Sequence, residues 1–132
     1  MTGKSDSGAL ILVLEDVEET RDGIQALLEA DGYRTNPARN EQDAVVAAKR
    51  EHPSLILVSM GGSRGDVLSV ASRVRECAGL APHVPVVIFC VETIAEGAEV
   101  EVQRSVYATR PDNFDQLKGL LHRLLDQPFA AL

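Results

Sequence analysis

The chain has 132 residues, the size of one domain around one core. Apolar residues make up 45% and charged residues 25%, an ordinary balance for a folded globular protein. The formal net charge of −7 argues against direct binding to nucleic acid, because phosphate contacts need clustered Lys and Arg. Apolar runs are shorter than the ~18 residues that span a bilayer, and the polar start lacks the core of a signal peptide. We therefore expect a cytoplasmic protein with no membrane segment.

Hydrophobic patterning predicts strands and helices in strict alternation. In chain order they are a strand at Ala9–Leu14, a helix at Thr20–Ala30, a strand at Tyr33–Pro37, a helix at Glu41–Arg50, a strand at Leu55–Val58, a helix at Asp66–Cys77, a strand at Val84–Val91, a helix at Thr93–Arg104, a strand at Ser105–Thr109 and a helix at Phe114–Leu125.

Four of the strands are continuous apolar runs instead of alternating ones, which is typical of parallel strands covered on both faces. The exception is Tyr33–Pro37, which is more polar. Pro37 has no N–H to donate to a neighbouring strand, so we expect this strand at an edge of the sheet.

The helices are predicted from apolar residues at three- and four-residue spacing, and Phe114–Leu125 is the clearest. Gly32 is expected to end the first helix, and Asp66 to cap the third at its N-terminus. The stripe of Thr93–Arg104 is weaker, because Gly97 interrupts it.

Alternating strands and helices joined by short connections predict an α/β fold. We expect a doubly wound five-stranded parallel sheet with helices on both faces, of the flavodoxin-like kind. The domain should cover residues 9–126, between a disordered N-terminal segment at 1–8 and a C-terminal tail at 127–132. In such sheets the functional groups lie at the carboxyl ends of the strands.

Glu15 and Asp16 follow the first strand directly. Two adjacent carboxylates repel each other, and a hard cation such as Mg²⁺ or a basic side chain would relieve the repulsion. By itself the pair favours a solvated start of a loop next to a helix N-terminus.

Four segments at the strand ends, taken together, have a specific order and spacing. They are Leu12–Asp16 with Arg21 downstream, Pro53–Ser59, Val84–Cys90 and Tyr107–Pro111. In combination they resemble the receiver domain of bacterial response regulators, of the chemotaxis single-domain type. The resemblance covers nearly the whole predicted domain and implies the receiver topology.

The resemblance also implies a role for each matching position. The acid pair that helps to bind Mg²⁺ falls on Glu15 and Asp16, the phosphate-accepting aspartate on Ser59, the hydroxyl residue that contacts the phosphoryl group on Cys90, the lysine that reaches the phosphate on Arg110, and the aromatic switch residue on Tyr107.

Three of these positions depart from the pattern of the family. Ser59 is a neutral hydroxyl where a carboxylate would attack phosphorus and help to bind the metal. Cys90 donates hydrogen bonds poorly, and Arg110 keeps the charge of lysine but has a different shape. We therefore expect a degenerate receiver with weak Mg²⁺ binding, no other cofactor and no aspartyl phosphorylation.

Such a module would act in two-component phosphorelay signalling by protein–protein contacts and not as an enzyme. A histidine kinase or an output protein is the expected partner, and a homodimer through residues 93–125 is a further expectation. Phe129 and Leu132 would either extend that face or fold back over the core of their own chain.

Other interpretations stay open. Arg110 would also serve as an internal ion-pair partner for Glu15 or Asp16, and Tyr107 as a plain edge-strand aromatic. The Gly61–Gly65 loop would suit a flavodoxin-like sensor of a small molecule or nucleotide. A hydrolase with Ser59 as nucleophile is disfavoured, because the nucleophile elbow needs glycine two residues earlier, where Leu57 stands.

Overall fold

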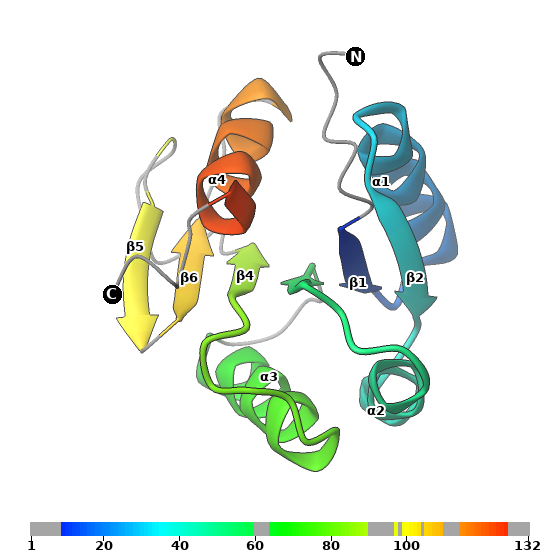
Figure 1. The fold of residues 1–132 in the computed structure, drawn as a ribbon, viewed down its shortest axis with the longest axis vertical. Helices are drawn as coiled ribbons and strands as arrows, with labels where there is room; N and C mark the ends of the chain where they lie inside the picture. The colour runs from blue at the N-terminus through cyan, green and yellow to red at the C-terminus, as the bar shows by residue number, and fades with distance from the viewer. Residues whose placement is uncertain are drawn as a thin grey trace.

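The computed structural model describes residues 9–59, 64–89, 97, 99–103, 105–109 and 114–126 of the chain. The elements within these ranges are β1 (Leu10–Leu14), α1 (Glu18–Ala30), β2 (Arg34–Ala38), α2 (Glu41–Arg50), β3 (Leu55–Val58), α3 (Arg64–Cys77), β4 (Val86–Phe89), β5 (Glu99–Gln103), β6 (Val106–Thr109) and α4 (Phe114–Asp126) (Figure 1). No described helix is long and apolar enough to cross a membrane.

The sheet has the order β2-β1-β3-β4-β6-β5. Its first five strands in that order are parallel, so the predicted doubly wound parallel sheet is confirmed. The expected edge position of β2 is confirmed as well. A sixth strand, β5, pairs antiparallel with β6 at the other edge.

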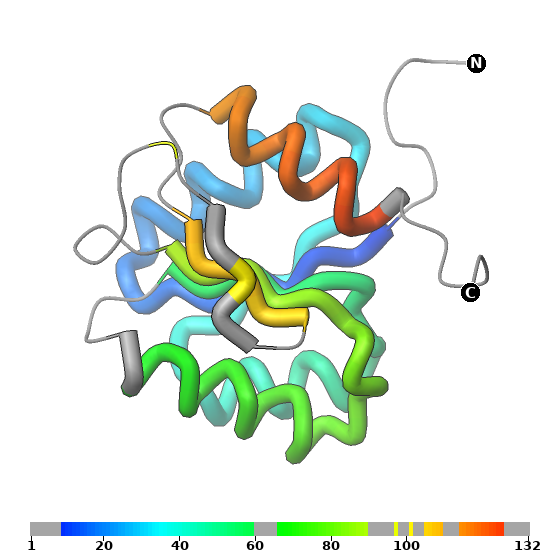
Figure 2. Tube along the Cα trace, turned by 90° about the vertical axis from the view of Figure 1, so that its left-hand side faces the viewer, coloured from blue at the N-terminus to red at the C-terminus, as the bar shows by residue number. Residues whose placement is uncertain are grey.

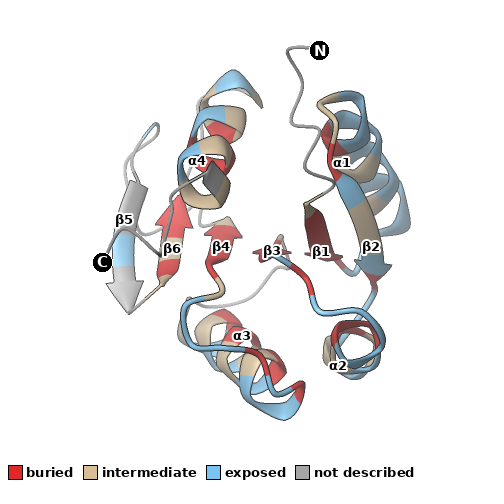
Figure 3. Ribbon diagram, viewed as in Figure 1, coloured by how far each residue is buried: buried red, intermediate tan, exposed pale blue. Residues whose placement is uncertain are grey.

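Helices cover both faces of the sheet, α1 and α4 on one and α2 and α3 on the other (Figures 1 and 2). Because successive strand residues point to opposite faces, each face has its own apolar cluster. The central strands β1 and β3 are buried along their whole length (Figure 3). Both halves of the core therefore meet on these two strands.

The predicted helix at Thr93–Arg104 is wrong. Among its described residues, Glu99–Gln103 form β5, and Gly97 has the positive φ of +83° that suits a turn. The sequence held a signal for the strand, because Glu99–Gln103 alternates acidic or polar residues with valine. Alternation at a period of two and β-branched valines favour an extended strand over a helix.

The helix ends follow local chemistry, with one correction. The Asn40 side chain accepts a hydrogen bond of 2.8 Å from the Asp43 N–H, which caps α2. Gly32, with φ +98°, follows the end of α1 as predicted. Asp66 was expected as the N-cap of α3, but that helix begins two residues earlier, at Arg64.

Candidate functional site

The carboxyl ends of β1 and β3 bring Glu15 and Ser59 to the same edge of the sheet. Leu14 pairs in register with Val58, and the Ser59 N–H donates to the Leu14 carbonyl over 2.9 Å. On the other side of β1, the Glu15 N–H donates to the Ala38 carbonyl over 3.0 Å. Main-chain hydrogen bonds therefore fix the positions of the Glu15 and Ser59 backbones at this edge.

The side chain of Glu15 is buried and turned toward its own loop. Only 3% of Glu15 is exposed, and its Oε2 accepts a hydrogen bond of 2.9 Å from the Val17 N–H. Arg21 Nη1 donates to the Glu15 carbonyl oxygen over 2.8 Å, which ties the first turn of α1 to the end of β1. Arg21 therefore positions the main chain of the acidic loop.

Asp16 does not share this environment, because it is exposed. Within the described ranges, no group of three or more His, Cys, Asp or Glu side chains is arranged to hold a metal ion. The oxygen ligands that this part of the edge could offer a metal are the carboxylates of Glu15 and Asp16 and the Ser59 hydroxyl. The Glu15 carboxylate already accepts a hydrogen bond from the main chain. This set is a poor fit for Mg²⁺, which favours several oxygen ligands with carboxylates among them.

Tyr107 lies in the middle of β6 and is partly exposed. It pairs in register with Val87 on β4 and with Glu101 on β5. Partial burial raises the pKa of the Tyr107 hydroxyl, and the charge of Glu101 raises it further. The aromatic position thus has a strand neighbour, β5, that the sequence analysis did not foresee.

Two of the predicted site residues, Cys90 and Arg110, lie outside the described residues. The same holds for positions 61–63 of the Gly61–Gly65 loop, so its role as an anion cradle stays a prediction. Thr109, which was not singled out, is the last residue of β6, pairs with Phe89 and is 1% exposed. Its sequence signal is that a polar residue, Thr109, ends an otherwise mostly apolar strand.

No family model matches the chain. The nitrogen assimilation regulatory protein NtrX of Azorhizobium caulinodans is 28% identical over 120 residues, which is 88% of this chain and 26% of that protein. The chain thus spans about a quarter of this relative's length.

Several solved structures are also similar to this chain. NtrX from Brucella abortus, in complex with ATP, matches with a TM-score of 0.70 and 25% identity over 90% of this chain and 27% of that one. The chemotaxis protein CheY4 of Vibrio cholerae matches with a TM-score of 0.69 and 20% identity, over 90% of this chain and 100% of that one. The receiver domain of a sensor histidine kinase from Pseudomonas aeruginosa, with magnesium in its active-site cleft, matches with a TM-score of 0.65 and 22% identity, over 92% and 100%.

Proposed function

We propose that this chain, which has the fold of response-regulator receiver domains, acts in two-component signalling by binding proteins and without aspartyl phosphorylation. The observation that supports the proposal most strongly is the placement of Ser59. It follows β3 beside the end of β1, where its main chain is bonded to Leu14 next to the buried Glu15. We infer from this placement that the Ser59 hydroxyl stands where the family has its acceptor carboxylate.

A serine at this position needs a base to become a nucleophile. Within the described part of the chain, the Ser59 hydroxyl has no hydrogen-bond partner that would remove its proton. A phosphoserine ester would in any case lack the lability of an acyl phosphate. The chain is therefore expected to catalyse no reaction.

The expected partner is a histidine kinase or an output protein, bound in the cytoplasm. Residues 93–125 were expected to form the docking face, and this region now comprises β5, β6 and α4. Figure 2 looks onto this side of the molecule, with α4 above and α3 below the β5–β6 pair. Because β5 ends the sheet, its outer main-chain groups are open to pairing with a further strand. A homodimer would use the same face.

Incubation with acetyl phosphate and Mg²⁺, followed by intact-mass spectrometry, tests the central claim. We expect no adduct on the unaltered chain. Ser59→Asp restores an acceptor carboxylate and is the positive control, since it should gain one phosphoryl group that is lost in base. A base-labile adduct on the unaltered chain would overturn the proposal.

A further inference from the structure

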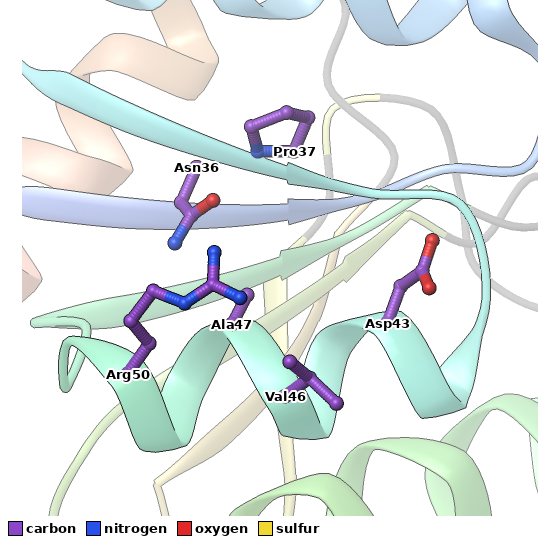
Figure 4. Close-up of a pocket in the computed structure, with 6 residues that line it drawn as sticks. All are labelled: Asn36, Pro37, Asp43, Val46, Ala47 and Arg50. Carbon is purple, nitrogen blue, oxygen red and sulfur yellow. The ribbon is translucent and has the colours of Figure 1, made fainter.

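A hollow of about 230 Å³ lies between the edge strand β2 and helix α2 and shares no residue with the carboxyl-edge site. It is lined by Asn36 and Pro37 from β2 and by Asp43, Val46, Ala47 and Arg50 from α2 (Figure 4). The four α2 residues recur at three- and four-residue spacing, so they form one face of that helix. The hollow therefore lies at the β2 edge of the sheet, between this strand and α2.

Two polar side chains of the hollow have no partner among the described residues. Asn36 pairs in register with Leu12, whose side chain belongs to the cluster beneath α2 and α3, so the Asn36 amide faces α2. Arg50 is exposed, and its guanidinium forms no ion pair with any described carboxylate. Figure 4 shows the amide and the guanidinium pointing toward one another across the hollow.

Two arginines of this corner already have an acidic partner among the described residues, unlike Arg50. Arg34 pairs with Glu51 over 2.7 Å, and Arg39 pairs with Asp43 over 2.9 Å. An unpaired guanidinium next to an unpaired amide presents several N–H donors to one point, and a carboxylate is the group that accepts from such a set.

The other side of the hollow is apolar. Val46 is 54% exposed, and Ala47 and Pro37 also line this side of the hollow. The volume is below the about 300–1,000 Å³ of sites for drug-sized ligands, so it suits one or two residues of a peptide.

We propose that this hollow binds a carboxylate that lies next to an apolar side chain, as in an acidic peptide segment or a peptide C-terminus. The carboxylate accepts from Arg50 and Asn36, and the apolar group covers Val46. This site is independent of the proposed loss of phosphorylation, because it shares no residue with the carboxyl edge.

Three small probes separate the sources of the carboxylate. N-acetyl-leucine carries a C-terminal carboxylate, N-acetyl-leucyl-aspartic α-amide carries a side-chain carboxylate, and N-acetyl-leucinamide carries neither. Titrations of the full chain are followed by ¹⁵N–¹H spectra. We expect one or both acids to shift the Val46 and Ala47 amides and the Arg50 Nε–H saturably at millimolar concentration, and the amide to do so at least about fivefold more weakly.

Two substitutions on the same helix turn supply the matched control. Arg50→Gln should weaken binding of the acid at least about fivefold, because it removes the charge that lines the hollow. Lys49→Gln removes the same charge one residue away and should change binding less than about twofold. Equal losses in both variants, equal affinity for the uncharged probe, or no saturable shift with either acid would overturn the proposal.

Discussion

Ser59 determines how many negative charges the carboxyl edge offers to a cation. With serine there, the described carboxylates after β1 are the buried Glu15 and the exposed Asp16. The Glu15 carboxylate is also held by the Val17 N–H. A hard divalent cation therefore gains less here than at a site with three acidic ligands.

We expect the chain to bind Mg²⁺ with a dissociation constant in the millimolar range or weaker. Ser59→Asp should tighten binding by about tenfold or more, because it adds a carboxylate beside Glu15. Ser59→Asn introduces a side chain with the shape of aspartate but no charge. It is the control and should leave Mg²⁺ binding unchanged. Calorimetric titration of the three forms measures this, and identical affinities would contradict the arrangement proposed for the edge.

Tyr107 should make the stability of the fold sensitive to alkaline pH. Burial and the charge of Glu101 raise the pKa of the Tyr107 hydroxyl above its usual value of 10.0. The unfolded chain releases this proton at lower pH than the folded chain, so the free energy of unfolding falls as the pH rises above about 10.

Urea unfolding of the unaltered chain and of Tyr107→Phe at several pH values measures this effect. The difference in free energy of unfolding should be constant below about pH 9 and should shift in favour of the phenylalanine variant above about pH 10. Parallel curves through that range would show that the Tyr107 hydroxyl has the same pKa in both states.

Among the elements, the two edge strands of the sheet, β2 and β5, differ in how open they are to pairing with a further strand. The Arg34 N–H bonds to Ala9 on the β1 side, so alternate residues Thr35 and Pro37 direct their main chain outward. Pro37 has no N–H, which leaves a gap in the free edge of β2. On β5 the exposed Glu101 provides a charge, but Glu99–Gln103 contains no proline, so its outer main-chain groups stay available for pairing.

Helix α1 contains a glycine, Gly23, at a position where the structure has room for a larger side chain. A methyl group added at Gly23 would meet nothing within 4 Å, and the residue is exposed in the helix interior. Gly23→Ala should therefore raise the free energy of unfolding by about 0.5–1 kcal/mol, because alanine loses less backbone entropy in a helix.

The same substitution at Gly32 serves as the contrasting control. Gly32 has φ +98°, a conformation that side chains disfavour, so Gly32→Ala should lower the free energy of unfolding by about 1 kcal/mol or more. Urea denaturation of both variants measures the two changes in the free energy of unfolding, which should have opposite signs. A destabilised Gly23→Ala would indicate that α1 has a contact at this position that the fold does not show.

For the whole molecule, the proposed docking face raises the question of self-association. If the β5–β6–α4 face binds a second copy, the dimer should be constitutive, because no phosphoryl group controls it. Buried apolar area contributes about 25 cal/mol per Å² before the costs of association. Sedimentation velocity of the intact chain and of a version ending at Asp126 measures this. A concentration-independent monomer in both forms would leave only a different protein as partner.

The sequence by itself determined most of the architecture. Short, continuous apolar runs such as Leu10–Leu14 and Leu55–Val58 favour strands covered on both faces, and the apolar stripe of Phe114–Asp126 favours a helix packed on the core. Chain order then placed Glu15 and Ser59 at the carboxyl edge, because parallel strands end on the same side.

Only the tertiary structure decided which strand lies at the edge of the sheet opposite β2. The alternation in Glu99–Gln103 is compatible with a strand, but its antiparallel pairing with β6 depends on main-chain partners that no local pattern specifies. The hollow at Asn36 and Arg50 likewise depends on how α2 packs beside the edge strand β2. Local sequence specifies which face of an element is apolar, but the neighbours that cover or expose that face come from residues far apart in the chain.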